Sequence, residues 1–234
     1  MTKISVVVLT KNSQKHINKC LLSIINQKYN DFEIIVIDAE SKDQTLDILY
    51  LRFIKKIKLI SVPSDTSIGK ARQVGVDNSQ GEIIAFIDSD VELPHENWLK
   101  NMSEPIMHLS YAINKKIAGT QTLSKCRDTD PWILKHLHNS FEYKNKVIGK
   151  DNYEMIGTGH CLIGKKYITE VGGFRDINSF EDLDMTRKIV ENGLVFVYLP
   201  EEKVYHYHVD NLWHYIKKHM IRNKINAIRR ILFE

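Results

Sequence analysis

Short apolar blocks separated by polar turns organise roughly the first 90 residues of the chain. Four of these blocks are rich in β-branched residues and have the length of buried strands: 4–9, 32–37, 59–62 and 83–87. Helical spacing of apolar residues follows the first two blocks, and residues 69–78 form a helical pattern before the fourth. Strands that alternate with helices predict βαβ units, and hence a mostly parallel sheet with right-handed crossovers.

The pattern changes after Pro94, where longer helical and aromatic segments begin. Helix is expected in three segments: 98–113 with a break at Pro105, 130–147, and 179–193. Strands are expected at 117–123, 195–199 and 204–208. Gly157–Leu162 is small and polar before it becomes apolar, which is typical of a strand edge that a ligand approaches closely.

The last stretch, Asn211–Phe233, has the pattern of an amphipathic helix. It contains neither Gly nor Pro, and most of its apolar and basic residues fall on opposite arcs of a helical wheel, although Lys217 and Lys224 intrude on the apolar side. Two interpretations stay open. The helix packs on the domain with a charged outer face, or it lies in the surface of an anionic membrane.

Acidic and polar side chains stand where the predicted strands end. Asp88-Ser89-Asp90 directly follows the fourth strand, and Thr10 and Asp38 end the first two. Parallel strands finish at the same edge of a sheet, which is where open α/β sheets bind ligands. Carboxylates at this density suit Mg²⁺ or Mn²⁺ held jointly with substrate phosphates, and a solvated acidic turn is the alternative for the tripeptide alone.

Phosphate recognition is expected without a glycine-rich loop. The chain has neither G-x-G-x-x-G nor a Walker A motif, which argues against a dinucleotide site or a P-loop. Phosphates would instead meet the metal, Lys70, Arg72 and the backbone N–H groups near Gly69. Lys70 and Arg72 could instead be ordinary solvated charges on a helix. For either residue taken alone, this second interpretation is favoured.

An acidic helix start and a pair of histidines add further candidates. Glu181, Asp182 and Asp184 fall in a first helical turn, where acids complement the helix dipole, but three acids exceed what capping needs. His206 and His208 share one face of a predicted strand, and one of them could be a ligand in an oxygen-rich metal site.

Composition sets broad limits on the class of protein. Of 234 residues, 43% are hydrophobic and 26% are charged, the profile of a soluble globular protein, and a net charge of +4 offers no global electrostatic case for nucleic-acid binding. Cys20, Cys126 and Cys161 lie far apart and are expected to be free thiols. The chain shows no signal-peptide pattern and no apolar run of about 20 residues, so a cytoplasmic protein is expected.

Together these motifs resemble the family 2 glycosyltransferases, the large inverting group with the GT-A fold. The similarity extends from Ile4 to His208, and the matching segments occur in order: SVVVLTKN, FEIIVIDAESKDQT, GKARQVG, GEIIAFIDSDVELP, GTGH, GGF, EDLDMTRKIVENG and YLPEEKVYHYH. The resemblance implies an α/β, GT-A fold: a Rossmann-like, mostly parallel central sheet flanked by helices, with a C-terminal amphipathic helix. Residues 1–208 would form the glycosyltransferase domain, with the nucleotide-sugar half at 1–93 and the acceptor half at 94–208, and 209–234 would form the basic helix.

The resemblance also implies a role for each matching side chain. A nucleotide-sugar would contact Thr10, Asn12, Asp38, Gly69, Arg72, Asp88, Ser89 and Arg187. A divalent cation, Mn²⁺ or Mg²⁺, would be held by Asp88, Asp90 and His206 or His208, with Asp90 the best direct ligand. Asp182 would be the catalytic base, and the acceptor would contact Gly157, Thr158, Gly159, His160 and Glu181.

Departures from the family pattern concern the nucleotide. Two aspartates are common where this chain has Asp38-Ala39, and R-N-x-G is common where it has Arg72-Gln73-Val74-Gly75. These differences bear on which nucleotide is bound more than on the class of reaction.

The expected activity is a metal-dependent, inverting transfer of a sugar from a UDP- or GDP-linked donor. The acceptor is expected to be a polyprenol phosphate or a lipid-linked glycan, reached by a cytoplasmic protein held on the inner face of the cell membrane by its C-terminal helix. Two other functions stay open: a non-catalytic nucleotide-sugar binding module and a nucleotidyltransferase. The four carboxylates at the candidate site argue against the first. The segment LTKNSQK argues against the second, because it is not a glycine- and basic-rich loop.

Overall fold

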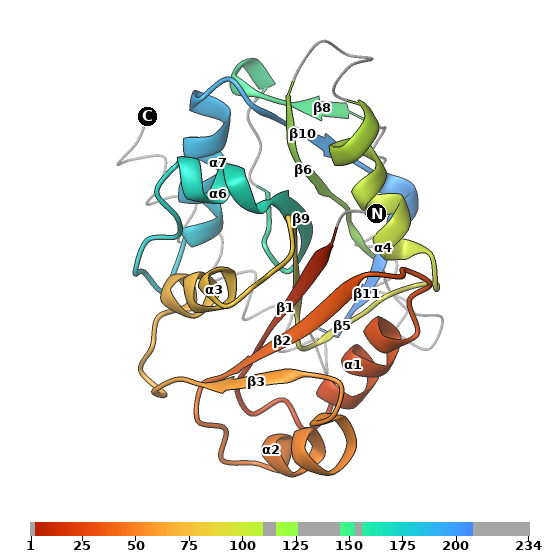
Figure 1. Ribbon diagram of the computed structural model, residues 1–234. Coiled ribbons are helices and arrows are strands. Elements are labelled where there is room, and N and C mark those ends of the chain that lie inside the picture. Colours follow the sequence, from red (N-terminus) through yellow and green to blue (C-terminus); the bar gives the residue numbers. More distant parts are fainter. Residues whose placement is uncertain (1–2, 110–115, 126–145, 153–155, 208–234) are drawn as a thin grey trace, which may run out of the picture.

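An eight-stranded sheet runs through the described part of the chain in the computed structural model (Figure 1). The structure describes residues 3–109, 116–125, 146–152 and 156–207. From one edge of the sheet to the other the strands are β3 (Lys58–Ser61), β2 (Phe32–Asp38), β1 (Ile4–Thr10), β4 (Ile83–Asp88), β9 (His160–Gly164), β6 (Ile117–Gln121), β10 (Val195–Tyr198) and β8 (Lys146–Ile148). A second, three-stranded sheet has the order β5 (Val91–Glu92), β11 (Val204–His206) and β7 (Ser124–Lys125).

The predicted mostly parallel sheet is confirmed. β3, β2, β1 and β4 pair in parallel, and so do β6 and β10. β9 lies between β4 and β6 and is antiparallel to both, and β8 is antiparallel to β10. The reversal places the start of β9 beside the end of β4, with His160 opposite Ile87. A late segment of the chain therefore reaches the Asp88–Asp90 motif.

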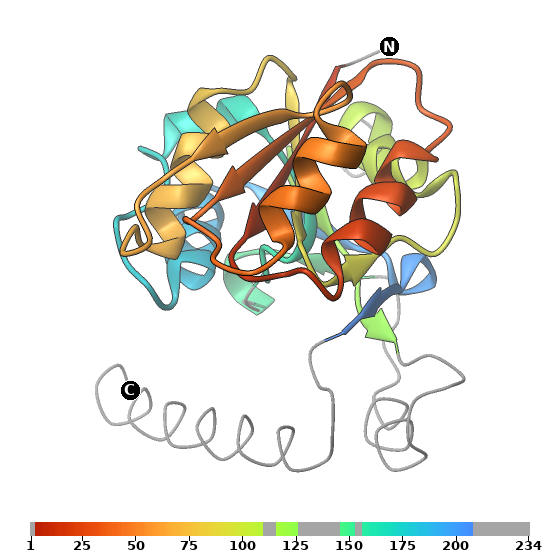
Figure 2. The same ribbon diagram turned by 90° about the horizontal axis from the view of Figure 1, so that it is seen from below.

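Helices cover both faces of the large sheet (Figure 1, Figure 2). One face packs against α1 (Ile17–Ile25), α2 (Thr45–Ile48) and α4 (Trp98–Glu104), and the other against α3 (Ile68–Asp77), α6 (Lys165–Glu170) and α7 (Glu181–Glu191). Side chains of β1 alternate between the two layers, because Val6 and Val8 face the first and Val7 faces the second. Burial on both faces explains why the central strands are continuous apolar runs in the sequence.

Short irregular helices account for the main differences from the predicted boundaries. A π-helical segment, η1 (Leu49–Phe53), continues α2, and another, η2 (Pro105–Leu109), continues α4. Pro105 has no backbone N–H to donate, which explains why the predicted helix changes character there. The 3₁₀ helices η3 (Lys150–Asn152) and η4 (Pro200–Glu202) are further short turns. Strands β6 and β11 end earlier than predicted, at Gln121 and His206.

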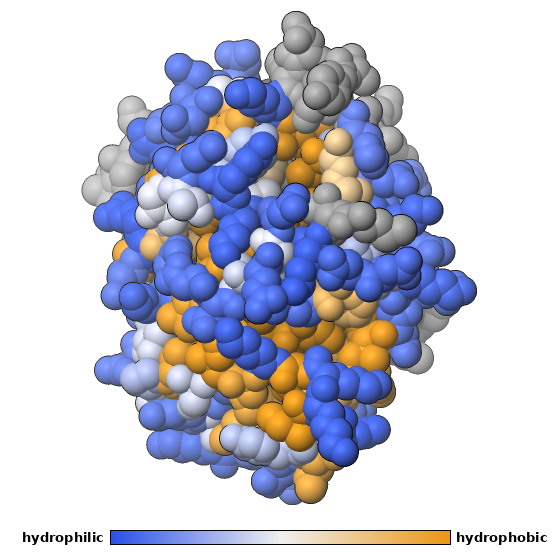
Figure 3. Space-filling model, viewed as in Figure 1, coloured by the Kyte–Doolittle hydropathy of each residue, from blue (hydrophilic) through white to orange (hydrophobic). Residues whose placement is uncertain are grey.

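Apolar side chains gather over the lower part of the face shown in Figure 3, where Figure 1 places β2 and β3. Three large apolar residues are exposed in the segment that precedes the edge strand β3: Tyr50 and Leu51 on η1, and Ile54 directly after it. Among the described residues, no helix is long and apolar enough to cross a membrane.

Several predictions concern residues outside the described ranges. These are the C-terminal helix at 209–234, most of the helical segment at 130–147, Cys126 and His208. The other two cysteines, Cys20 and Cys161, are buried free thiols, as predicted.

Candidate active site

The ends of three neighbouring strands form one edge of the candidate site. The register of β1 with β2 places Thr10 opposite Asp38, and the register of β1 with β4 places Leu9 opposite Asp88. The predicted convergence of strand ends is confirmed. A cleft of about 460 Å³ opens here, lined by Leu9, Asn12, Ser13, Gln14, Lys15, His16, Asp43, Asp88, Ser89 and Asp90.

Ser41 links the loops that follow β1 and β2. Its amide and hydroxyl donate to the two carboxylate oxygens of Asp38, at 2.9 and 2.5 Å. Its hydroxyl oxygen accepts from the Asn12 amide at 2.9 Å, and the Asn12 side-chain oxygen accepts from the Lys42 amide at 2.8 Å. Asp38 is fully buried and supports these loops through Ser41. Contact of Thr10, Asn12 or Asp38 with a nucleotide stays a prediction.

Side chains of the first loop tie the Asp88–Asp90 segment to the rest of the cleft. The hydroxyls of Ser13 and Ser89 lie 2.8 Å apart. The Ser13 amide donates to the Thr45 hydroxyl at 2.7 Å, and the Gln14 amide donates to the Asp43 carboxylate at 3.1 Å. Ser13, Gln14 and Asp43 were not among the predicted site residues. The signal for the first two was the unbroken polar run directly after the first strand.

Asp88, Asp90 and His206 meet at the end of β4. One ligand atom from each lies within 4.8 Å of the others, and His206 Nε2 is 3.0 Å from Asp90 Oδ1. The small sheet brings His206 here, because β11 pairs with β5 and places His206 opposite Val91. Two carboxylates and one imidazole fit a divalent cation that prefers oxygen ligands. The structure thus brings together three of the four predicted metal ligands, and His208 lies outside the described residues.

Arg72 joins this cluster to the later part of the chain. It lies on α3 and is only 5% exposed. Its guanidinium donates to the Thr158 carbonyl oxygen at 3.0 Å and lies 3.5 Å from the carboxylates of Asp88 and Glu181. A cation between two carboxylates reduces the cost of burying all three charges. The interpretation of Arg72 as a solvated helix charge is therefore wrong, whereas Lys70 is exposed.

Glu181 and Asp182 begin α7 beside Arg72. Burial raises the pKa of Asp182, and the charge of Asp88 adds to this effect, while hydrogen bonding and Arg72 oppose it. One oxygen of Asp182 accepts from the Leu183 amide at 2.8 Å. Burial also raises the pKa of Glu181, with Arg72 opposing and Asp182 contributing. A carboxylate with raised basicity is better suited to accept a proton than an ordinary aspartate.

The backbone at 157–160 lies against Asp88. The Gly159 carbonyl accepts from the Asp88 amide at 2.9 Å, and a Cβ added to Gly159 would lie 2.5 Å from Asp88 Oδ2. His160 starts β9, with its ring centroid 5.7 Å from that of His206. Burial, with a contribution from His206, lowers the pKa of His160 to about 3, so its imidazole is neutral at physiological pH. This segment lies against the predicted metal ligands Asp88 and His206, and acceptor contact stays a prediction.

Replacing Gly159 with alanine is expected to weaken Mn²⁺ binding about 10–100-fold, because the added methyl group would displace the Asp88 carboxylate. The Mn²⁺-dependent rise in melting temperature measures this affinity. Gly157→Ala is the matched control, because a Cβ there meets nothing within 4 Å. If Gly159→Ala binds Mn²⁺ as tightly as the parent, Asp88 does not depend on this contact.

Two predicted donor contacts have other partners. The Gly69 amide donates to the Ile177 carbonyl oxygen at 3.0 Å, and a Cβ on Gly69 would collide with the carbonyl oxygen of Arg175. Gly69 therefore allows α3 to approach the 175–177 loop. The Arg187 side chain is 65% exposed and pairs with Glu191 at 2.7 Å. Nucleotide-sugar contact by Gly69 and Arg187 stays a prediction.

Tyr207 packs beside the cleft, against His16, and was not predicted. Its ring stacks on His16 with a centroid distance of 4.8 Å, and its hydroxyl donates to Glu92. Its amide donates to the Asp90 carbonyl oxygen at 2.8 Å. The position of Asp90 is therefore fixed partly by the end of β11.

A Rossmann-like sheet with an acidic, histidine-containing site at its strand ends is the GT-A architecture. Residues 5–172 match the model of Glycosyl transferase family 2, and the chain belongs to that family.

Curated relatives carry the same class of name. The chain is 30% identical over 105 residues to an uncharacterized glycosyltransferase of Haemophilus influenzae, covering 44% of this chain and 42% of the relative. It is 38% identical over 95 residues to the poly(ribitol-phosphate) beta-N-acetylglucosaminyltransferase TarS of Staphylococcus aureus, covering 38% of this chain and 16% of TarS. The chain therefore spans less than half the length of these relatives.

Solved structures share the fold. The crystal structure of S. aureus TarS has a TM-score of 0.70 and 22% identity, over 87% of this chain and 36% of that one. The mannosyltransferase PcManGT of Pyrobaculum calidifontis, solved with GDP-Man and Mn²⁺, has a TM-score of 0.69 and 18% identity, over 97% of this chain and 64% of that one. At these identities the likeness establishes the GT-A fold.

Proposed function

We propose that this chain is a metal-dependent, inverting glycosyltransferase that moves a sugar from a UDP- or GDP-linked donor to an acceptor. The observation that carries the proposal is the cluster of Asp88, Asp90 and His206 at the strand ends. Arg72 connects this cluster to Glu181, which is adjacent in sequence to Asp182. Ligands for a diphosphate-bound cation and a candidate base therefore belong to one connected site.

The residues around the cluster hold its ligands in place. A divalent cation bound by Asp88, Asp90 and His206 would stabilise the negative charge that develops on the nucleoside-diphosphate leaving group. Ser89 is held by Ser13, and Arg72 balances the charge of Asp88. Such fixed positions mean that the ligands need little rearrangement when donor binds.

Asp182 is the proposed base. The acceptor oxygen forms a bond to the anomeric carbon while the bond from that carbon to the donor phosphate oxygen breaks. The proton of the acceptor hydroxyl passes to the Asp182 carboxylate, and the bonding electron pair leaves with the nucleoside diphosphate. Attack from the side opposite the leaving group inverts the anomeric centre. The raised pKa of Asp182 favours this proton transfer.

Two structural neighbours support the class of donor. TarS has been solved with UDP-GlcNAc, and PcManGT with GDP-Man and Mn²⁺. Carboxylate and imidazole ligands suit Mn²⁺, and carboxylates also suit Mg²⁺. We therefore propose Mn²⁺ or Mg²⁺ as the cofactor.

The proposed acceptor is a polyprenol phosphate or a lipid-linked glycan at the inner face of the cell membrane. The support is the basic amphipathic pattern of 209–234, outside the described residues. The full chain is expected to float with liposomes that contain phosphatidylglycerol and to stay unbound with neutral ones. Failure to float with the anionic liposomes would remove the main support for a lipid acceptor.

A thermal-shift panel of nucleotide-sugars with Mn²⁺, Mg²⁺ or EDTA tests the donor and the metal together. One nucleotide-sugar at about 100 times its Kd should add roughly 2.7 kcal/mol of stability, and EDTA should remove that gain. Stabilisation without release of nucleoside diphosphate would favour a non-catalytic binding module. Stabilisation that persists in EDTA would contradict the metal role of Asp88 and Asp90.

A further inference from the structure

Phe180 has a conformation and an exposure that its position in the helix does not explain. It is the N-cap residue of α7, with φ 64° and ψ 18°, and it makes no side-chain capping bond. N-cap positions favour Ser, Thr, Asp, Asn or Gly, and left-handed backbone favours Gly or Asn, because a bulky side chain crowds the neighbouring carbonyl. A phenylalanine is unfavourable here on both counts. Burial of its ring does not compensate, because the residue is 41% exposed.

Left-handed backbone in this structure marks the loops around the candidate site. Among the described residues, the non-glycine positions with positive φ are Asn12, Glu40 and Phe180. Asn12 lines the cleft, Glu40 precedes Ser41 in the loop after β2, and Phe180 directly precedes Glu181. Strain of this kind concentrates where the surrounding structure maintains a functional geometry. Asparagine tolerates the left-handed conformation, whereas a bulky residue such as phenylalanine adopts it only at a cost in backbone strain.

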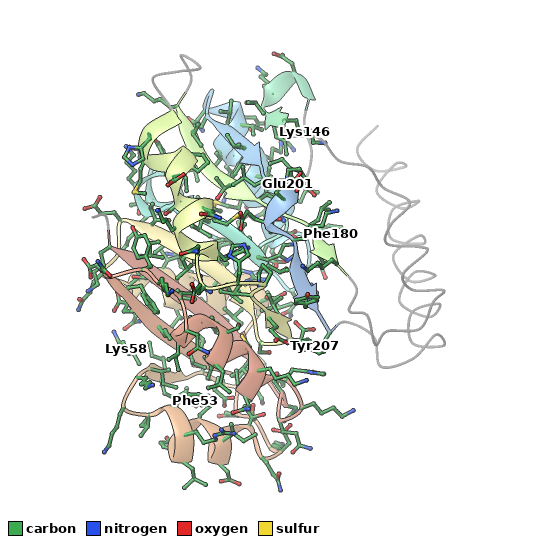
Figure 4. All side chains as sticks on the ribbon, turned by 90° about the vertical axis from the view of Figure 1, so that its right-hand side faces the viewer. Phe53, Lys58, Lys146, Phe180, Glu201 and Tyr207 are labelled. Atoms are coloured by element: carbon green, nitrogen blue, oxygen red, sulfur yellow. The ribbon has the colours of Figure 1, made fainter. Side chains whose placement is uncertain are left out.

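Phe180 lies on the side of the molecule at which the parallel strands end. In Figure 4 it is on the same side as Tyr207, whereas Lys58, at the start of β3, is on the opposite side. Tyr207 stacks on His16, which lines the cleft. The exposed Phe180 is two residues from the proposed base in sequence, and it lies on the side of the molecule where the candidate site opens.

We propose that Phe180 binds the acceptor, and that the acceptor presents a sugar ring whose C–H face stacks on the Phe180 ring. The inference rests on the proposed function and narrows its acceptor to a glycan. One face of a pyranose carries mainly C–H groups, and contact with an aromatic ring removes apolar area from water on both partners. The hydroxyls at the edge of the sugar ring remain available to Asp182. A bare phosphate group offers no such face.

Saturation-transfer NMR tests this contact without requiring catalysis. The probes are methyl β-D-glucopyranoside and methyl β-D-N-acetylglucosaminide, with glycerol as the non-stacking control, added to the full chain. Aromatic saturation is expected to reach the ring C–H protons of at least one glycoside and not those of glycerol. In Phe180→Ala the glycoside Kd should rise about 5–100-fold, the range for loss of one aromatic stacking partner. Phe180→Trp should keep the signal.

Two further variants separate loss of the ring from loss of the fold. Tyr50→Ala removes an aromatic side chain that is 56% exposed on η1, and it should leave the glycoside signal unchanged. Phe180→Gly removes both the ring and the strain, so it should melt about 2–4 °C above Phe180→Ala, yet lose the glycoside signal equally. A signal retained by Phe180→Gly or Phe180→Ala, or absent from the parent with both glycosides, overturns the proposal.

Release of nucleoside diphosphate, measured on the parent in parallel, distinguishes the two proposals. Glycoside contact that depends on Phe180, in a chain that releases no nucleoside diphosphate from any nucleotide-sugar with the glycosides present as acceptors, would contradict the proposed transferase activity and support a glycan-binding site at Phe180. If the parent releases nucleoside diphosphate but the glycoside signal is the same with and without the Phe180 ring, only the proposed acceptor contact is refuted.

Discussion

Asp182→Asn is expected to lower the turnover of the donor about 10²–10⁴-fold, the usual contribution of a positioned general base. The amide has nearly the same size as the carboxylate and keeps an oxygen to accept from the Leu183 amide, so the start of α7 should be preserved. Donor affinity, measured by thermal shift, is expected to stay close to that of the parent. The measurement is release of UDP or GDP from the donor identified by the panel.

Asp184→Asn is the matched control for this substitution. Asp184 lies in the same helical turn but pairs with Arg175 and Lys188, at 3.4 and 2.8 Å. Its turnover should remain within a few-fold of the parent. If Asp182→Asn releases nucleoside diphosphate as fast as the parent with a hydroxyl acceptor, the base assignment is wrong. A phosphate acceptor would be an exception, because it is already ionised and needs no strong base.

The pH dependence of the parent follows from the same carboxylate. Burial raises the pKa of Asp182 above 3.8, its ordinary value. Only the ionised form accepts a proton, so kcat/KM should fall as the pH decreases through the raised pKa, at a higher pH than for an exposed aspartate. Asp184→Asn should keep this acid limb, and Asp182→Asn should lose it. If the acid limb of the kcat/KM profile survives in Asp182→Asn, the titrating group is not Asp182.

Asp90→Asn is expected to lower turnover about 10³-fold and to abolish the metal-dependent part of donor binding, because an interaction of about 4 kcal/mol with the developing charge depends on the cation. Asp90 is the carboxylate next to His206 in the cluster, 3.0 Å from Nε2. The readouts are nucleoside-diphosphate release and the difference in melting temperature between Mn²⁺ and EDTA.

Asp77→Asn provides the control for Asp90. Asp77 is an exposed acid at the end of α3, and its carboxylate accepts from the Gln73 side chain at 2.7 Å. It should leave both readouts unchanged. An Asp90→Asn variant whose donor binding still responds to Mn²⁺ would show that the cation is held elsewhere, and the assignment of Asp88 and His206 would fall with it.

The local parts of this fold were predictable because each strand is a self-contained apolar run. The register that sets Thr10 against Asp38 follows from two parallel strands of equal length, and the convergence of their ends follows from the direction of the sheet. The proximity of His206 to Asp88 and Asp90 was inferred from family motifs. In the structure it depends on β11 pairing with β5, and a two-residue strand such as β5 carries too little pattern to be predicted.

The connections between distant segments could not be predicted. Arg72 has the spacing of an ordinary charged residue on a helix, and its burial depends on two carboxylates, Asp88 and Glu181, the second of which is 109 residues away. Asp38 shows a similar limit. Its position at a strand end indicated a ligand contact, which stays a prediction, and the structure adds that Ser41, three residues later, donates to both of its oxygens. Sequence pattern locates the site, and the packing of separate segments decides which side chain faces it.

The antiparallel insertion of β9 bears on how the chain can be divided. A fragment that stops at residue 93 would contain β1 to β5 but would leave β4 without the neighbour that pairs with Ile83–Ile87 in the full chain. β4 would still pair with β1, but its other edge would be open, and an open edge of this apolar composition is a template for aggregation between copies. Chimeras that exchange the first half of the chain with that of another family member would therefore need a matching β9, because the two halves share one continuous ladder of backbone hydrogen bonds.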